Sequence, residues 1–492
     1  MAIFNEKAAN DNTSRDRRDD WIERLIRASE PSLRSGLTFG ELEEELLSVS
    51  NELVRRVLEQ TLQELSDGYA EQIMVTLPSE KGTSNVTAQY RRHEVGTARY
   101  YSLCGPLDIA RATYRLVGTR NGPTIVPVEL QAGLIARATP ALAYALAQGH
   151  AKEPIRSVEQ DLHSAHRHPP SRSTMDRIAR EIGLSVHAVV PVIEPALRAR
   201  EELPAGAHAV NIGLDRTTVP MEEPLHDKVV ERPAVMKPQI TVRYRMAYVG
   251  TVCVTNQDGE VLCGWRYAAP AHEGPAEVLG RMVADVNRAL DQKPRLKLGV
   301  VQDGAAEMWN LVREALRENP QTKKRKWRET VDRYHFMERV AALLECFYPD
   351  ASEQPKRREL LDRWRREIDT SDRAPKAIHD WFEKEALRLD REEKKKRFMW
   401  LRFDEKLGCY MIRQDHFHYA SLADDGLHSG SGVTEGACKF LIAARAKRSG
   451  QRWTKRGITA VLALRSLLAS ERLDRFWRLF APRYQAMCLN AA

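Results

Sequence analysis

The feature that most constrains the fold of this chain is a pair of short apolar runs that each end in an aspartate. The run at 209–214 is followed by Asp215, and the run at 298–302 is followed by Asp303. The sequence between them predicts a meander of strands and then a helix. These segments are the strands 240–248, 251–255 and 261–268, the hairpin turn 256–259 and the helix 275–290. Two strands with acidic ends in one sheet predict an α/β core that brings both aspartates to one site.

A third acid, Glu435, opens a helical pattern directly after the glycine- and serine-rich segment 429–434. It follows Asp303 by 132 residues (303 to 435), and most of that gap is helical and highly charged. A bare ribonuclease-H-like core would bridge the second and third acids with one strand and one helix. We therefore predict a mixed, multidomain α/β chain with a ribonuclease-H-like core that is interrupted by an all-helical insertion at 336–430.

The residue types at these three positions indicate metal chemistry. Carboxylate oxygens are the ligands that Mg²⁺ and Mn²⁺ prefer, and paired ions serve phosphodiester chemistry by activating a nucleophile and stabilising the leaving oxygen. We predict that Asp215, Asp303 and Glu435 are catalytic and hold two Mg²⁺ or Mn²⁺ ions. Each acid taken alone is also a common turn former or helix cap, so the hypothesis depends on all three contexts together.

A further acid and a histidine, Asp332 and His335, lie at a predicted junction between a strand and a helix. Three positions apart, they would face the metal cluster or orient the scissile phosphate, and we include both as catalytic candidates. The alternative is a capping aspartate beside a histidine that has only a structural role.

The segment after Glu435 carries charge of one sign. Residues 436–470 contain eight basic side chains and not one acidic side chain. Solvated helices usually mix the two signs, so this segment favours a polyanion as partner. The predicted DNA contacts are Lys439, Arg445, Lys447, Arg448 and Arg452, together with Trp453, which would stack on a base or belong to the core.

A second DNA-binding region is predicted before the core, in the helical patterns 130–148, 155–164 and 171–185. The last of these begins after Ser171, a good N-cap, and presents Arg172, Ser173 and Arg177. Three short helices of this kind are similar to a helix-turn-helix unit, whose final helix enters the major groove. The alternative is a small helical subdomain with an ordinary solvated face.

The chain is too long for one hydrophobic core, so we predict several structural units. At 38–68 the apolar spacing indicates a helical hairpin, or alternatively a dimerising coiled coil. A Gly-Pro turn at Gly105 indicates a β-hairpin. The predicted segments are a disordered tail (1–36), a helical region (37–95), a β-hairpin (96–128), the helix-turn-helix-like region (129–200), the first part of the core (207–335), the insertion (336–430), the last part of the core (431–480) and a C-terminal tail (481–492).

Composition narrows the class of partner. Of the 492 residues, 76 are Lys or Arg and 68 are Asp or Glu, which leaves a net charge of +8 and moderately favours nucleic acid. The seven cysteines are scattered, without a Cys-x-x-Cys pair, and indicate reduced thiols. We see neither a signal peptide nor a membrane-spanning run. The sequence therefore predicts a cytoplasmic, nucleoid-associated protein without a membrane or small-molecule partner.

Five motifs together resemble a bacterial insertion-sequence transposase, and the motif around Glu435 is the most specific of them. The similarity covers about 95 to 480 and is greatest to the Kra-type family within the Mutator-like group of Asp-Asp-Glu transposases. The motifs are Leu214–Met221, Gln302–Ala305, Asp332–His335, Ser429–Lys439 and Lys447–Trp453. Members often carry a cysteine-rich zinc element ahead of the β-hairpin, whereas only Cys104 lies near that position here.

The resemblance implies a ribonuclease-H-like core with Asp215, Asp303 and Glu435 as metal ligands and the Asp332/His335 pair as a group signature. It implies cleavage at transposon ends and strand transfer, with terminal inverted repeats and target DNA as partners. We expect a homodimer or a higher oligomer on DNA. Two alternatives stay open: a catalytically silent relative that acts as a DNA-binding protein, and a ribonuclease-H-like nuclease that does not join ends.

Overall fold

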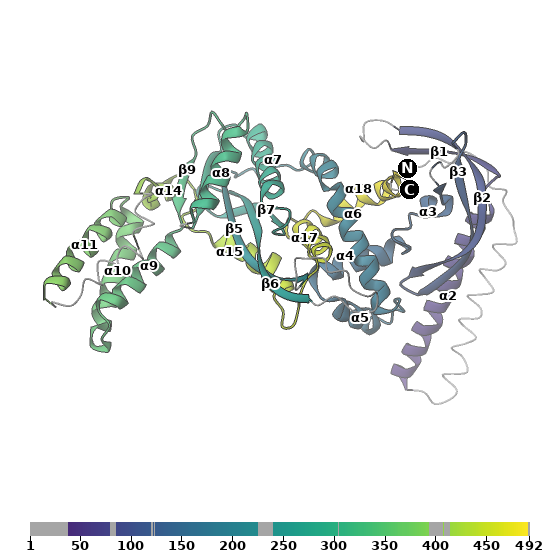
Figure 1. Ribbon diagram of the computed structural model, residues 1–492, viewed down its shortest axis with the longest axis horizontal. Helices are drawn as coiled ribbons and strands as arrows, with labels where there is room; N and C mark the ends of the chain where they lie inside the picture. Colours follow the sequence, from purple (N-terminus) through teal and green to yellow (C-terminus); the bar gives the residue numbers. More distant parts are fainter. Residues whose placement is uncertain are drawn as a thin grey trace. The chain divides into compact units, whose positions relative to one another are not determined.

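The computed structural model is mixed α/β with two sheets (Figure 1). It describes residues 38–78, 85–119, 122, 124–224, 240–303, 305–392, 407 and 414–490, so the predicted tail at 1–36 lies outside the described residues. The chain divides into two compact units. The first comprises the described residues up to Leu197 together with Thr459–Leu468 and the segment from Arg472 onward. The second comprises Arg198–Ile458 and Ala469–Glu471.

The first unit contains a four-stranded antiparallel sheet and helix α2, Phe39–Asp67. The strands, in the order β1-β2-β3-β4, are Gln72–Pro78, Asn85–Ser102, Gly105–Leu116 and Thr124–Ile125. The hairpin turn predicted before Gly105 is confirmed. The prediction of a helical region through residue 95 is wrong, because strands begin at Gln72 and their buried side chains, among them Val75 and Tyr90, pack together. The predicted hairpin at 38–68 is one continuous helix, α2.

Helix α2 protects the open edge of β3. The Glu59 carboxylate accepts from the Asp108 backbone N–H at 2.8 Å, and the Gln63 amide both accepts from the Ala110 N–H (2.9 Å) and donates to the Ala110 carbonyl (3.0 Å). Ser66 donates to the same carbonyl at 3.0 Å. These side chains form hydrogen bonds with backbone groups of β3 that would otherwise be free to pair with another strand.

The remainder of the first unit is a helical bundle. Its helices are α3 (Pro127–Gln131), α4 (Pro140–Lys152), α5 (Ile155–Ser164), α6 (Arg172–Arg198), the later part of α17 (Lys455–Ala469) and α18 (Leu473–Asn490). Helix α6 is longer than the predicted 171–185. Gly183 of α6 meets α17 so closely that an added Cβ would lie 2.6 Å from the Ala460 carbonyl oxygen.

The C-terminal segment belongs to this bundle. Leu464, Leu467, Phe476 and Phe480 join the core that α4 and α6 form. Residues 459–480 were predicted to complete the ribonuclease-H-like core, and 481–492 were predicted as a tail. Both predictions differ from the structure, because the apolar faces of α17 and α18 match the bundle and α18 continues to Asn490.

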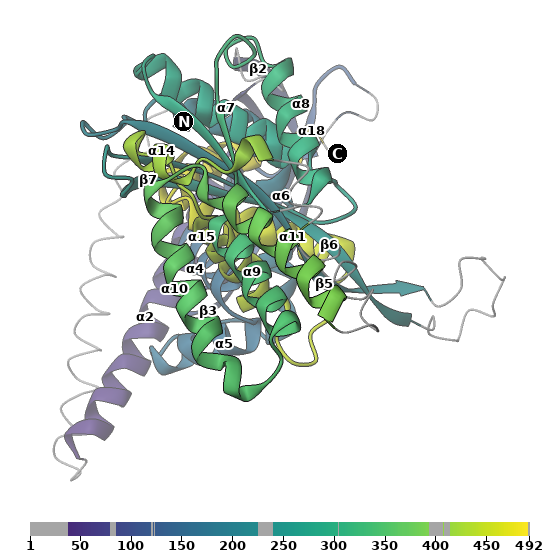
Figure 2. The same cartoon turned by 90° about the vertical axis from the view of Figure 1, so that its left-hand side faces the viewer.

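The second unit is built on a five-stranded sheet in the order β7-β6-β5-β8-β9. The strands are β5 (Ala209–Pro224), β6 (Ile240–Thr255), β7 (Val261–Ala269), β8 (Lys297–Gln302) and β9 (Arg328–Val331). β5, β6 and β7 form an antiparallel meander, whereas β8 is parallel to β5 and β9 is parallel to β8. β8 pairs with β5 only at 209–212 and β7 pairs with β6 only from Tyr248 onward, so residues 217–224 of β5 and 240–247 of β6 extend from the sheet as a two-stranded ribbon (Figure 2).

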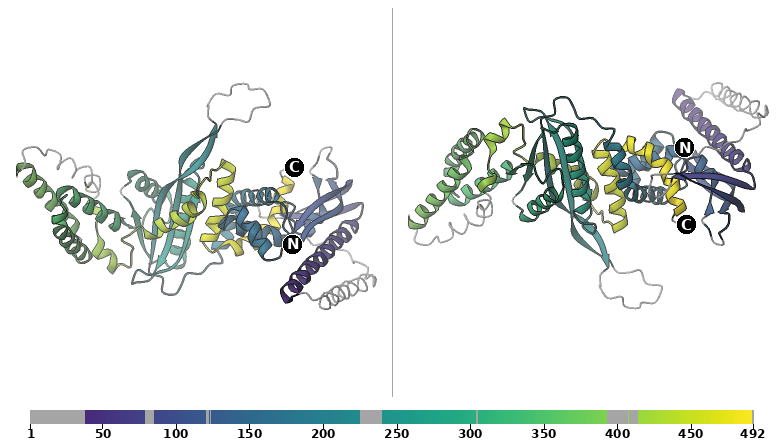
Figure 3. Two further views of the ribbon diagram at one scale, coloured as in Figure 1. Left: turned by 90° about the horizontal axis from the view of Figure 1, so that it is seen from below. Right: turned by 90° about the horizontal axis from the view of Figure 1, so that it is seen from above.

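Helices α7 (Ala276–Gln292) and α8 (Ala306–Glu318) pack against this sheet. Val286, Trp309 and Val312 face Val252 and Val300 in one core. Between β9 and Gly430, every regular element in the described segments is helical. Helices α9 (Arg333–Phe347), α10 (Gln354–Thr370) and α11 (Ala374–Glu392) lie side by side (Figure 3). The shorter helices are η1 (Ala351–Glu353), η3 (Gln414–His416) and α14 (Tyr419–Asp424).

A buried ion cluster joins the end of this helical segment to the sheet. The Glu329 carboxylate of β9 accepts from the Arg313 Nε (2.8 Å) and from the Trp327 indole (3.0 Å), and it pairs with the His416 ring of η3. Burial opposes ionisation of Glu329, but the hydrogen bonds from Arg313, His416 and Trp327 hold its pKa well below the ordinary 4.5. The cluster therefore contains an ionised carboxylate.

We expect the Glu329→Gln substitution to destabilise the second unit by about 3 kcal/mol, because it leaves the Arg313 charge half-buried without its partner. A carboxyl with a lowered folded-state pKa stabilises the fold above its unfolded pKa, and this contribution is lost as the pH falls through the folded value. In urea unfolding, the free energy of unfolding of the wild type should therefore decrease below about pH 4.5. The variant should show a shallower decrease over the same pH range. Equal slopes for both proteins would contradict the assignment.

Among the residues that the structure describes, no helix combines the length and the apolar character needed to cross a membrane. Five cysteines in the described segments, at 104, 253, 263, 346 and 438, are free thiols.

Candidate catalytic site

The site lies where β5 and β8 separate. Asp303 directly follows β8, as predicted, but Asp215 lies within β5 rather than at its end, because pairing with β6 continues the strand to Pro224. A cavity of about 190 Å³ opens at this point. Asp215, Asp303, Glu435 and His335 all line it, together with backbone and side-chain atoms of Leu214, Val301, Gln302, Ser431 and Thr434.

Asp215, like the other two predicted metal ligands, is half-buried. Burial raises the pKa of its carboxyl, and the negative charge of Asp303 raises it further, whereas hydrogen bonds lower it. The donors of these bonds are the Arg216 backbone N–H, 2.6 Å from Oδ1, and the Cys438 thiol, 3.4 Å from Oδ2. The two aspartates are thus close enough to repel each other, which is the electrostatic situation that a bound cation relieves.

Asp303 is fixed by the start of α8. Its Oδ1 accepts from the Ala305 N–H at 2.8 Å, and its backbone carbonyl accepts from the Trp309 indole at 2.8 Å. Because Trp309 is fully buried in the core, this second bond ties the end of β8 to the first turn of α8. The other carboxylate oxygen remains directed by a rigid backbone.

Glu435 comes from α15 (Gly432–Ala437), which continues through the wider turn η4 (Cys438–Ala443) into α16 (Ala444–Ala446). The Ser431 hydroxyl donates to its Oε1 at 3.0 Å. On the preceding residue, the Thr434 hydroxyl bonds the Thr251 hydroxyl of β6 at 2.7 Å. The helix approaches β5 closely at Gly213, where an added Cβ would lie 2.3 Å from the Thr434 Oγ1. A glycine in the strand therefore allows the third acid to reach the first.

Asp332 and His335 meet Glu435, but they differ in role. Asp332 is fully buried and caps α9: its Oδ1 accepts from the His335 N–H at 2.7 Å and its Oδ2 from the Ser431 N–H. Its carboxylate therefore caps the helix, as the alternative expected, and it also lies beside His335. The His335 Nδ1 lies 3.3 Å from the Asp332 Oδ1 and 3.8 Å from the Glu435 Oε1. Ligand atoms of these three residues all lie within 4.8 Å of one another.

The basic segment after Glu435 is partly exposed and partly buried. Lys439 is exposed, one helical turn beyond Glu435. Lys447 donates to the Thr217 hydroxyl (2.6 Å), Arg448 donates to the Ala444 carbonyl (2.8 Å), and Arg452 pairs with Glu222 (2.7 Å). All four cations lie on or beside the extended part of β5 and the helices that follow Glu435.

Arg445 differs from the prediction because it is only 3% exposed, and Trp453, 9% exposed, follows the alternative that places it in the core. The Arg445 guanidinium lies 4.8 Å from the Trp453 ring centroid, and the indole N–H donates to the Ala446 carbonyl at 3.1 Å. The Trp453 backbone also pairs with the edge of β5. These two side chains therefore hold the basic segment against the ribbon, and neither is placed to contact a phosphate or a base.

The three residues predicted to contact the DNA major groove, Arg172, Ser173 and Arg177, belong to the first unit and lie at the start of α6. Arg172 pairs with Glu159 of α5, with Nε 2.7 Å from the carboxylate, and Arg177 pairs with Glu181 at 3.7 Å. Ser173 lies 3.2 Å from the Ser171 hydroxyl, oxygen to oxygen. All three side chains are at the surface, where exposed ion pairs exchange readily for other partners.

Several contributors to the site had no clear signal in the sequence. Cys438 follows Glu435 by three positions and therefore shares its helix face, which is the one clue that spacing offered. Burial raises the pKa of its thiol, so it stays protonated and donates to Asp215. Gln302, buried beside Asp303, accepts from the Leu214 N–H at 3.4 Å.

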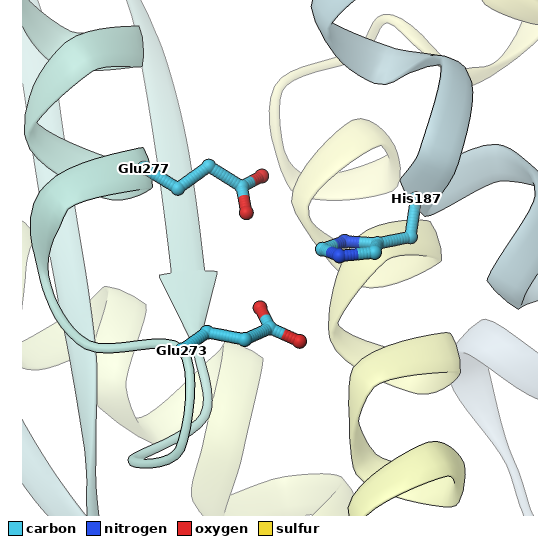
Figure 4. Close-up of side chains that lie close together, drawn as sticks. All are labelled: His187, Glu273 and Glu277. Atoms are coloured by element: carbon cyan, nitrogen blue, oxygen red, sulfur yellow. The ribbon is translucent and has the colours of Figure 1, made fainter.

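Two other carboxylates lie close together: Glu277 projects from the start of α7 and Glu273 from the loop before it (Figure 4). His187, drawn in the same view, belongs to α6 of the first unit. Within the second unit, Glu277 pairs with Arg281 at 3.6 Å and Glu273 with His272 at 3.6 Å. These acids therefore already have partners in their own segment.

No protein-family model matches this chain, and no curated protein matches it either. What distinguishes the cavity is its chemistry: three carboxylates and an imidazole from four separate segments surround one small volume. Such a set suits a divalent cation and chemistry on a charged substrate.

Proposed function

We propose that this protein is an Asp-Asp-Glu transposase, which cuts DNA at transposon ends and transfers the strands into target DNA. The observation that carries the proposal is the shared cavity of Asp215, Asp303 and Glu435. These acids come from a long strand, a strand end and a helix start, and the chain between the last two spans 132 residues (303 to 435). Three acids that served only as helix caps or turn formers would not be expected to line one cavity.

The topology supports the same proposal. A meander of three antiparallel strands followed by two strands parallel to the first is the arrangement expected of a ribonuclease-H-like core. The helices between β9 and α15 occupy the place of the predicted insertion. Asp425, after α14, pairs with Lys297 of β8 and, at 3.0 Å, with Arg328 of β9, which anchors the return of this segment to the sheet.

The donor set fits Mg²⁺ or Mn²⁺, with Asp215, Asp303 and Glu435 as the ligands. Because Asp215 and Asp303 repel each other, the state in which both carboxylates are ionised without a bound cation is unfavourable. In addition, the His335 Nδ1 is buried beside Glu435 without a hydrogen-bond partner of good geometry. When bound, such ions activate a water or hydroxyl nucleophile and stabilise the leaving oxygen.

The protein's own groups position the reacting strand. Asp332 caps α9 through the His335 backbone, so it holds the imidazole at the cavity wall. The Ser431 hydroxyl orients Glu435, and the Cys438 thiol orients Asp215. Lys439, Lys447 and Arg448 would offset the phosphate charge along the strand that enters the cavity.

We expect the Lys439→Ala substitution to weaken DNA binding for all sequences alike. Removing one phosphate contact should reduce the slope of log K against log salt concentration by about 1. Fluorescence anisotropy with a labelled duplex at several salt concentrations measures this slope. The matched control is Lys376→Ala, an exposed lysine of α11. Equal slopes for the two variants would show that Lys439 makes no phosphate contact.

The test of the proposed function is an assay that detects joining as well as cutting. Purified protein is incubated with supercoiled plasmid and a labelled duplex that carries a free 3′-hydroxyl, with Mg²⁺ or Mn²⁺. Covalent transfer of the label to the plasmid supports a transposase. Nicking without transfer would indicate a nuclease, and DNA retardation without any nicking would indicate a silent DNA-binding relative.

A further inference from the structure

We propose that a groove beside the candidate catalytic cavity binds one unstacked nucleotide, with its base against Tyr334. This inference rests on the proposed action on DNA and adds a substrate contact to it. The groove has a volume of about 310 Å³. Its walls come from the first turns of α9, from Arg365 of α10 and from the chain at Gly430.

The floor of the groove suits an aromatic ring. Tyr334, Met337 and Ala341 recur at spacings of three and four and so share one face of α9. Met337 is only 8% exposed, whereas Tyr334 is 64% exposed, an unusual state for a large aromatic side chain. Stacking on aromatic side chains is the usual way in which proteins hold unpaired bases.

The rim of the groove suits a phosphodiester. Arg333 and Arg365 both contribute to it, although each has an acidic partner: Arg333 pairs with Asp369 at 2.6 Å and Arg365 with Asp362 at 3.1 Å. The Arg365 pair is exposed, and the Arg333 side chain is half-buried with its partner Asp369 exposed. Ion pairs in contact with solvent contribute little stability, so a phosphate can replace the carboxylate as partner. Glu338 at the same rim offers an acceptor to an exocyclic amino group.

The groove adjoins the catalytic cavity through a shared wall. The Tyr334 ring lies edge-on to the His335 ring, with centroids 6.3 Å apart, and His335 lines the cavity. On the opposite side, Gly430 lines the groove while Ser431, the next residue, lines the cavity and donates to Glu435. A base stacked on Tyr334 would therefore belong to a nucleotide next to the phosphate in the cavity.

Other ligand classes fit this combination less well. A free phosphate would leave the apolar floor of Met337 and Ala341 in water, and an apolar peptide would bury the two guanidinium groups. An added Cβ at Gly430 would meet nothing closer than the Asp332 Oδ2 at 3.9 Å, so the wall is open on that side. A nucleotide satisfies both the apolar floor and the cationic rim.

The test uses the full chain and a 12-nucleotide single-stranded oligodeoxythymidine that carries one central 2-aminopurine, without added metal. Stacking on Tyr334 should quench the probe. The Tyr334→Ala variant should bind about 5- to 50-fold more weakly and lose the quenching, whereas Tyr334→Trp should retain both. The control is Tyr244→Ala, which removes another exposed tyrosine, on the β5–β6 ribbon, and should leave the quenching unchanged.

Unchanged quenching and affinity in Tyr334→Ala would overturn the proposal, as would equal losses in Tyr334→Ala and Tyr244→Ala. A change of oligomeric state in Tyr334→Ala with unaltered oligonucleotide binding would instead assign the groove to a second copy of the chain, and would also overturn it. The proposed function is judged separately by cleavage and joining. If carboxylate-dependent cleavage persists while Tyr334 proves irrelevant, only the groove proposal falls; if the probe is quenched but no DNA is ever cut, only the transposase proposal falls.

Discussion

The Asp215→Asn protein is expected to lose at least about 10³-fold of its metal-dependent DNA cleavage, which corresponds to about 4 kcal/mol of transition-state stabilisation. The substitution keeps the shape of the side chain but removes the charge that a divalent ion requires. Glu435→Gln should have the same effect, since the third ligand is equally needed. DNA binding should remain close to that of the wild type, because the exposed cations supply most of the affinity.

The matched control for these variants is Glu307→Gln. Glu307 lies on α8, pairs with Arg216 and does not line the cavity, so its loss should change cleavage less than about threefold. Nicking of supercoiled plasmid in Mg²⁺ or Mn²⁺ measures all three proteins. Wild-type rates for Asp215→Asn and Glu435→Gln together would end the assignment of these acids as metal ligands.

The core of the second unit was largely predictable, because the buried parts of β5, β6, β7 and β8 consist mostly of apolar residues. The position of Asp303 after β8 followed directly from that pattern. Asp215 was harder, because β5 continues past it through polar residues such as Thr217 and Glu222. In a two-stranded ribbon both faces meet solvent, so the alternation that marks a strand is weak.

The strand segments of the first unit that lie before residue 96 were missed for a related reason. In β2, side chains such as Arg91, Glu94 and Thr97 are exposed, and a bulge between Arg92 and Glu94 shifts the alternation. The packing of α17 and α18 was also unpredictable, because an amphipathic face shows that a helix is buried but not which partner buries it. Likewise, arginine and tryptophan side chains often contact nucleic acid at a protein surface. Only the structure shows that Arg445 and Trp453 contact each other and are internal here.

The prediction with the largest structural consequence concerns Gly213 of β5. Gly213→Ala places a Cβ 2.3 Å from the Thr434 Oγ1 and 3.2 Å from the Val301 carbonyl oxygen. Neither neighbour moves freely, because Thr434 is bonded to Thr251 and Val301 lies in the sheet. We expect a loss of about 2 kcal/mol in the free energy of unfolding. Cleavage should fall about 10²-fold, since α15 must shift and displace Glu435 from the aspartates.

The matched control is Gly432→Ala, three residues before Glu435, where an added Cβ meets no atom within 4 Å. It should keep wild-type stability and activity, because alanine is the better helix former and nothing obstructs it. The second-site change Thr434→Ala should restore part of the cleavage lost in Gly213→Ala by removing the obstructing hydroxyl, although it also breaks the bond to Thr251. If Gly213→Ala has the stability and the DNA cleavage rate of the wild type, the close approach of α15 to β5 does not determine the position of Glu435.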